Sequence, residues 1–217
     1  MKSLKNIIAS IILTATALFA ITGCDNDALT NNSATISYIN ALDKQVTFYV
    51  KESSDSSSVY HNKHKVTTLT QGNYSDELRH KWFSIQESRF AVEDTNSRDE
   101  QMSIEYRLKD DRDYWSVAWL NNDEYNLSLF KRVSSDRDGL YRVRIFANDK
   151  LDVYIGESTT KILTTETGQA SDYLSIDKCT DLVIESNAID LCSGDFGHSY
   201  LLVVNANGLI AMAEEHK

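Results

Sequence analysis

The chain has 217 residues, with 32 acidic against 22 basic side chains and a formal net charge of −10. An acidic body of this kind argues against nucleic acid and against anionic headgroups as partners. Proline is absent and glycine is scarce, so most turns must be built from Asn, Asp and Ser.

The N-terminus has the features of a bacterial export signal. Lys2 and Lys5 precede an uncharged run over residues 7–21, which is shorter than the roughly 20 apolar residues of a membrane-spanning helix. Its size and flanks are typical of a signal peptide. The sequence Ile21-Thr22-Gly23-Cys24 follows at once and resembles the lipobox of bacterial lipoproteins.

The lipobox resemblance implies that residues 1–23 are a signal peptide, cleaved off before Cys24. It also implies that Cys24 carries diacylglycerol and an amide-linked acyl chain such as palmitate, and two or more chains anchor a protein stably. An ordinary secretory signal with an incidental cysteine is the alternative. Residues 24–33 are short and polar, and we expect them to form a flexible tether.

The residue after Cys24 bears on which membrane holds the protein. Asp25, followed by Asn26, resembles the sorting signal that retains lipoproteins at the inner membrane in enterobacterial-type sorting. The resemblance implies a location in the bacterial cell envelope, facing the periplasm, with the inner membrane favoured over the outer.

After the tether, apolar residues alternate with polar ones, which predicts β-strands almost throughout. The alternating runs, in chain order, are 34–40, 45–51, 114–120, 126–129 and 141–145, and more continuously apolar runs follow at 181–186 and 200–204. Asn121-Asn122-Asp123 and Asn205-Ala-Asn207-Gly208 separate such runs and are typical of turns. The sequence therefore predicts an all-β fold.

An internal repeat divides the chain. Residues 34–50 resemble residues 141–155, each with a strand, an Asn/Asp/Lys turn and a second strand, and residues 114–130 resemble residues 200–212. We therefore expect two tandem antiparallel β-sandwich units, Ig-like or transthyretin-like. Their predicted ranges are residues 33–132 and 140–217, joined by a linker at 133–139. Chance similarity between hairpins is the alternative.

The second unit also resembles a known family. Its runs Arg142-Val-Arg-Ile-Phe-Ala147, Leu151-Asp-Val-Tyr-Ile-Gly156 and Tyr200-Leu-Leu-Val-Val204 are similar to the bacterial domain-of-unknown-function family four-three-nine-seven. That family consists of β-sandwich modules, often in tandem in lipoproteins and exported proteins. Here Asn148-Asp149-Lys150 replaces the family's proline-rich turn, and residues 33–132 match less closely. The resemblance implies no catalytic residues.

Two cysteines remain besides Cys24. Cys179 and Cys192 are an even pair in an oxidising compartment and flank a predicted strand, which favours a disulfide. Two free thiols or a metal pair are the alternatives, although only His198 lies nearby as a further ligand.

Three short motifs could carry chemistry. His61 and His64, with His80 or a carboxylate, could bind a metal, but they follow a serine-rich stretch and are more typical of a solvated loop. Residues 194–199 contain Asp, His and Ser without a nucleophile elbow. Residues 110–113 are acidic without the spacing of a calcium loop. We therefore expect no enzyme, no cofactor and no metal site.

Paired aromatic residues are the remaining candidates. Tyr49 and Tyr154 occupy equivalent places in the two repeats, on the strand face opposite the apolar residues, where they could be cross-strand partners or part of a binding patch. We expect a membrane-anchored periplasmic lipoprotein with a non-enzymatic binding or structural role, mainly protein interaction. The alternative is a lipoprotein that binds carbohydrate through exposed aromatics, or metal through His61 and His64.

Overall fold

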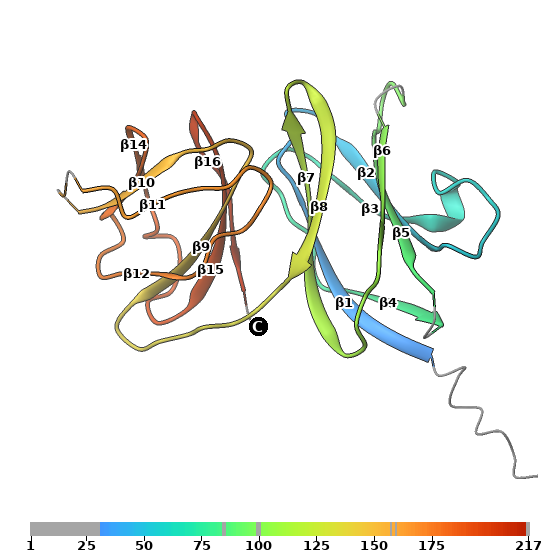
Figure 1. Cartoon of the computed structure of the whole chain (residues 1–217), viewed down its shortest axis with the longest axis horizontal. Helices are drawn as coiled ribbons and strands as arrows, with labels where there is room; N and C mark the ends of the chain where they lie inside the picture. The colour runs from blue at the N-terminus through green and yellow to red at the C-terminus, as the bar shows by residue number, and fades with distance from the viewer. Residues whose placement is uncertain (1–30, 84–85, 99–100, 157, 159, 216–217) are drawn as a thin grey trace, which may run out of the picture.

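The computed structural model describes residues 31–83, 86–98, 101–156, 158 and 160–215 (Figure 1). The predicted signal peptide, Cys24 and Asp25 lie outside these residues. Across the described part of the chain no helix has the length and apolarity to cross a membrane. Within the described residues the fold is nearly all β and includes a short 3-10 turn, η2 (Asn62–His64), so the predicted fold class is confirmed.

The first unit contains eight strands in two four-stranded sheets. Sheet A has the order β4 (Leu78–Phe83), β1 (Asn31–Asn40), β7 (Arg112–Asn121) and β8 (Glu124–Lys131). Sheet B has the order β3 (Lys65–Leu69), β2 (Val46–Glu52), β5 (Ser88–Asp94) and β6 (Gln101–Tyr106).

The second unit repeats this arrangement with shorter strands. Sheet C has the order β12 (Leu174–Ile176), β9 (Tyr141–Ala147), β15 (Ser199–Asn205) and β16 (Gly208–Glu214). Sheet D has the order β11 (Leu163–Thr164), β10 (Asp152–Ile155), β13 (Leu182–Ile184) and β14 (Asn187–Ile189).

The strand orders confirm the internal repeat. Each strand from β1 to β8 has its counterpart eight places later, and the same neighbours pair in both units. One feature was not expected: β1 pairs in parallel with β7, and β9 with β15, whereas the other strand pairs are antiparallel. Ile36 lies opposite Tyr114 in the first pair and Val143 opposite Tyr200 in the second. The two units are therefore built on one topology.

Alternation along the strands builds a separate core in each unit. The first core lies between sheets A and B and includes Ile36, Tyr38 and Phe48. The second lies between sheets C and D and includes Ile145 and Val153. These positions are fully or almost fully buried, as the period-two pattern predicts.

The predicted turns close the two C-terminal hairpins. Asn122 and Asp123 have positive φ values of 50° and 65° between β7 and β8, which is the geometry of a two-residue hairpin turn with matching twist. Asn205 pairs with Gly208 at the β15–β16 hairpin. Asn and Asp tolerate this backbone region better than other side chains, so a chain without proline can still turn tightly.

The N-terminal strand begins earlier than the pattern suggested. β1 starts at Asn31, before the alternation that begins at Ala34. The reason is local pairing: Ser33 donates its backbone N–H to Asp110 Oδ1 at 2.8 Å and its Oγ accepts from Arg79 at 2.8 Å. Six residues, 25–30, therefore separate Cys24 from the first strand.

A third apolar cluster joins the two units. The outer faces of sheets A and C meet in the middle of the molecule (Figure 1). Ile39, Trp115 and Val117 from the first unit pack with residues of the second that include Phe146, Leu201 and Val203. Because the parallel strand pairs superimpose in register, Ile39 corresponds to Phe146, Trp115 to Leu201 and Val117 to Val203. Each unit thus presents the same positions to the other.

Candidate functional site

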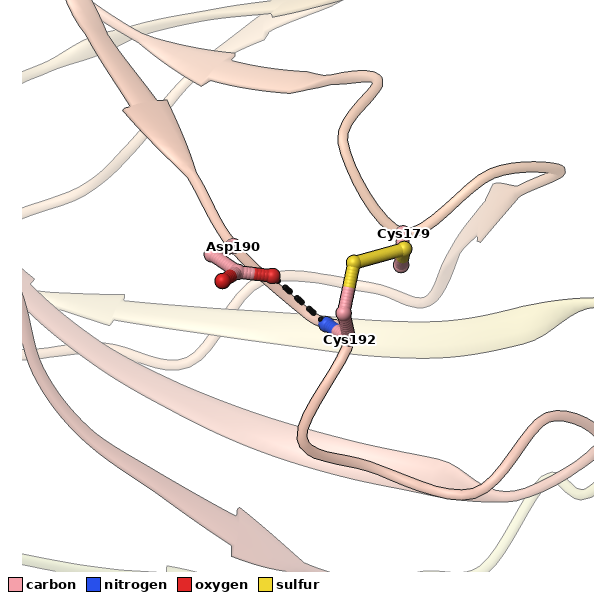
Figure 2. Close-up of side chains that lie close together, drawn as sticks. All are labelled: Cys179, Asp190 and Cys192. Atoms are coloured by element: carbon pink, nitrogen blue, oxygen red, sulfur yellow. Dashed lines mark hydrogen bonds between the residues drawn. A yellow bond between two sulfur atoms is a disulfide. The ribbon is translucent and has the colours of Figure 1, made fainter.

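The predicted disulfide is present. Cys179 and Cys192 are bonded, with their Cα atoms 4.8 Å apart, and the bridge encloses the β13–β14 hairpin (Figure 2). Backbone hydrogen bonds hold the same loop, from Leu191 N to Cys179 O and from Cys192 N to Asp190 Oδ1, both at 2.8 Å. The two sulfurs and an Asp190 oxygen lie within 4.8 Å of one another. Thiolate is the metal ligand, however, and the bridge uses both sulfurs, so we interpret this pair as structural.

The histidines do not converge on a metal site in the part of the chain that the structure describes. The rings of His61 and His64 are 6.5 Å apart, and His80 instead stacks on Trp82 and contacts Ser88 Oγ at 2.9 Å. No group of three ligand atoms forms around them within the described residues. The metal-binding alternative therefore gains no geometric support.

His64 belongs to a hydrogen-bonded loop that contains the residue types of a catalytic triad, namely Ser57, His64 and Asp55. Ser57 Oγ lies 2.8 Å from His64 Nε2 and donates to Asp55 Oδ1 at 2.7 Å, while Asp55 Oδ2 lies 3.5 Å from the same His64 nitrogen. A catalytic triad requires serine and carboxylate on opposite ring nitrogens. Here both contact Nε2, so the carboxylate cannot orient the ring for proton transfer.

The same network fixes the loop against sheet B. Hydrogen bonds from Lys63 and Ser57 hold the pKa of Asp55 well below its usual range, and burial lowers the pKa of His64. Lys51 donates its Nζ to the backbone carbonyls of Asp55 and Ser57. These contacts make the loop a cover for the outer face of β2 and β5.

That cover changes the interpretation of the paired tyrosines. Tyr49 does project outward from the core, but Val59 and Tyr60 of the loop pack on it and leave it 4% exposed. Its hydroxyl donates to Glu93. Tyr154 is half-buried. Tyr49 is therefore a packing residue, and the two tyrosines do not form a matched exposed pair.

The residues of the two remaining motifs, 194–199 and 110–113, make structural contacts with different partners. Ser199 is fully buried and donates to Asp136 Oδ1 at 2.5 Å, whereas His198 contacts Glu214 Oε1 at 2.7 Å. Serine and histidine thus have different partners and form no relay. Asp110 accepts the backbone N–H of Ser33 and so secures the start of β1.

An open cleft lies at the junction of the two units. Its wall in the first unit is the segment between β3 and β4, and its wall in the second unit is β16 with the segment before β15. A depression of about 280 Å³ is lined by residues that include Tyr74, Asp195, Tyr200, Met212 and Glu214. A narrower depression of about 50 Å³ shares Tyr74 and Glu214 and reaches Trp115 and Arg132.

Tyr74 is held in the cleft by its backbone while its side chain stays 48% exposed. The residue bridges to Ile39 of β1, and the next residue, Ser75, donates its N–H to Tyr38 O at 2.9 Å. These backbone contacts to β1 therefore fix the position of the Tyr74 backbone. The Tyr74 ring projects from it into the cleft and is accessible to a partner.

Arg132 closes the floor of the cleft. Its guanidinium bonds Glu77 at 2.6 Å, donates to the carbonyls of Glu215 and Glu214 at 2.7 and 3.0 Å, and lies over the Trp115 ring at 4.9 Å. The side chain is only 6% exposed. Both units thus contribute acceptors to the Arg132 guanidinium. Its positive charge is balanced by Glu77 and by the two carbonyls within the junction.

The remaining charges of the cleft are mostly negative. Asp76 and Glu77 line one side, and Asp195 and Glu214 the other. The hydrogen bond to Glu214 raises the pKa of His198 above its ordinary value. An exposed aromatic ring beside carboxylates is suited to a cationic or hydroxyl-rich partner.

No protein-family model matches this chain. A search of curated proteins also finds no relative. The likeness of residues 142–204 to family four-three-nine-seven therefore stays a prediction from the sequence. Tyr74 was missed by sequence reasoning, because its exposure depends on the docking of two units that alternation within each strand does not reveal.

Proposed function

We propose that the chain is a lipid-anchored, extracytoplasmic lipoprotein with a non-enzymatic role, which uses the cleft between its two units to bind a protein partner. The observation that carries the binding role is the exposed Tyr74 ring in a cleft that exists only because the units dock. The anchor is supported by the Ile21-Thr22-Gly23-Cys24 sequence after an apolar run, and Asp25 favours retention at the inner membrane.

The composition of the cleft supports a protein partner with a basic segment. Interfaces are enriched in Tyr and Met near their centres, and Tyr74, Tyr200 and Met212 all line this depression. Asp195 and Glu214 provide a negative rim, which favours a positively charged partner and speeds its approach.

Carbohydrate is the second candidate ligand. A tyrosine face beside carboxylate oxygens is also able to stack on a sugar ring and accept its hydroxyl hydrogens. The two candidates differ in their ligand: a protein partner is captured as a cross-linked polypeptide, whereas a sugar competes for Tyr74 without forming such a product.

Site-specific photocrosslinking tests the proposal. The full-length lipoprotein is produced in its bacterial host with p-benzoylphenylalanine in place of Tyr74, and in a matched control with the same photoprobe in place of Ile162, which is also 48% exposed. The proposal predicts one discrete cross-linked protein from position 74 that is absent from position 162. Tyr74→Ala should weaken its co-purification by about tenfold or more.

Three outcomes would contradict this proposal. Equal cross-linking from both positions would place the contact outside the cleft. Loss of the cross-link on addition of a cell-envelope glycan, with no protein product, would favour carbohydrate. A soluble protein that is never found in the membrane fraction would contradict the anchor.

A further inference from the structure

Strand β4 carries a basic and aromatic outer face. Arg79, Lys81 and Phe83 alternate along the strand and are all exposed, whereas His80 and Trp82 between them turn toward the interior. Phe83 is 41% exposed. Within the described residues, neither Arg79 nor Lys81 forms an ion pair with an acidic side chain. The strand therefore presents two cations and a phenyl ring to solvent on a chain that is acidic overall.

This face lies beside the first residues of β1. β4 is an edge strand of sheet A, and its register places Phe83 opposite Asn31, Lys81 opposite Ser33 and Arg79 opposite Thr35. β4 runs alongside the start of β1 at the lower edge of the first unit (Figure 1). The acidic Asp113 lies across β1 from Arg79, since both pair with Thr35 from opposite sides.

The length of the tether places this face near the bilayer. Seven residue steps from Cys24 to Asn31 span at most about 25 Å when fully extended. If Cys24 is lipidated, Asn31 and the Phe83 end of β4 that pairs with it are confined to about that distance from the headgroups. Confinement gives even weak contacts a high effective concentration.

We infer that the outer face of β4 is a second contact between the anchored protein and its own bilayer. Arg79 and Lys81 attract the anionic headgroups, and Phe83 enters the interfacial region, where aromatic rings are favoured. The rest of the acidic surface is repelled by the same headgroups, so the contact also orients the body. This inference rests on the lipid anchor of the proposed function.

A depth measurement on the lipidated full-length chain tests the inference. Phe83→Cys is labelled with an environment-sensitive fluorophore and compared with Phe196→Cys, a site in the second unit that is 52% exposed. The introduced thiol is the reactive one if Cys24 is acylated, because Cys179 and Cys192 are joined. Both proteins are reconstituted in vesicles of phosphatidylethanolamine and phosphatidylglycerol that contain a brominated lipid as quencher.

The inference predicts several-fold stronger quenching at position 83 than at position 196. The quenching at position 83 should fall toward the control value in the Arg79→Glu/Lys81→Glu variant, or in vesicles of phosphatidylcholine. Lys150→Glu in the second unit should change nothing. Circular dichroism confirms that each variant is folded.

Flotation of the same vesicles separates the two claims. A protein that floats with the vesicles but shows equal quenching at both sites overturns the β4 contact and leaves the anchor intact. A protein that does not float overturns both the anchor and the inference built on it.

Discussion

The indole Nε1 of Trp115 donates a hydrogen bond of 2.7 Å to Oε2 of Glu215, a residue 100 positions further along the chain. Arg144 of the second unit contacts the other carboxylate oxygen at 3.2 Å. Burial raises the pKa of Glu215, because a carboxylate that leaves water loses solvation. A buried charge of this kind is tolerated only with close partners from both units, so the junction behaves as part of the core.

The first prediction concerns Arg132, which joins the same junction. Arg132→Ala removes charge-assisted hydrogen bonds to Glu77 and to two carbonyls, and it should lower the free energy of unfolding by about 2–3 kcal/mol. Urea denaturation measures this change. The control is Arg89→Ala, whose partner Glu105 is exposed and whose loss should cost less than about 1 kcal/mol. Equal effects of the two variants would mean that the contacts of Arg132 in the junction add no more stability than an exposed ion pair does.

The second prediction uses two glycines that occupy equivalent turns. Gly72 and Gly168 have φ values of 73° and 70° and donate their N–H groups to Asn40 O and Ala147 O, which are equivalent positions of β1 and β9. A Cβ at Gly168 would overlap the ring of Trp119, and one at Gly72 would lie 2.7 Å from the carbonyl oxygen of Ile210. Each turn thus approaches the other unit closely.

Alanine substitution should show by a loss of stability how closely these turns contact the other unit. Gly168→Ala should destabilise by about 1–3 kcal/mol more than Gly139→Ala, because Gly139 has a similar φ of 76° with nothing within 4 Å of a Cβ. The control therefore carries the same backbone cost without the steric overlap. Thermal unfolding of the two variants measures the difference, and similar melting temperatures would show that Trp119 moves aside freely.

The third prediction is a loss of stability in mild acid through His80. Burial lowers the pKa of His80 to about 4 from an ordinary value of 6.5, so the unfolded chain binds this proton more strongly. The free energy of unfolding is therefore highest, with respect to this group, above pH 6.5. It falls as the pH drops from 6.5 to about 4, by roughly 3 kcal/mol in total.

Replacement of His80 should remove this pH dependence. His80→Gln keeps a side chain able to contact Ser88 and should unfold with a flatter profile between pH 6.5 and 4, by chemical denaturation at each pH. In His198→Gln, which retains His80, the fall should persist. A wild-type profile with no loss in that interval, or a His80 ring that titrates near 6.5 by NMR, contradicts the prediction.

The fourth prediction concerns the Cys179–Cys192 bridge. Its 13-residue separation gives an expected contribution of roughly 3 kcal/mol by the chain-entropy estimate. Cys179→Ser/Cys192→Ser should therefore unfold at a lower urea concentration, and non-reducing peptide mapping of the wild type should find the two cysteines in one linked pair. Free alkylation of both thiols in the native protein would overturn the bridge.

Much of the architecture follows from local sequence. The period-two pattern located strands such as 34–40 and 141–145, and the similarity of residues 34–50 to 141–155 led to two units of one topology. The Asn and Asp turns were also visible, because these residues tolerate the left-handed backbone region. The Cys179–Cys192 bridge was predicted because these two cysteines remain once Cys24 is assigned to the lipid anchor.

The features that were missed depend on packing between distant segments. β1 pairs in parallel with β7, and the alternation of apolar residues within one strand carries no information on the direction of the neighbouring strand. Tyr49 was placed on the outward face of its strand, but the loop that carries Val59 and Tyr60 covers it. Tyr74 and Arg132 gain their roles only from the docking of the two units.

The most direct test of the central claim is the mass of the N-terminal peptide of the full-length protein, produced in a bacterial host and purified from it. The account predicts a peptide that begins at Cys24, lacks residues 1–23, and carries the added mass of a diacylglycerol and an amide-linked acyl chain. A Cys24→Ala variant should lack this lipid and leave the membrane fraction. A wild-type protein that retains residues 1–23, or one that is cleaved but bears an unmodified Cys24, would contradict the account.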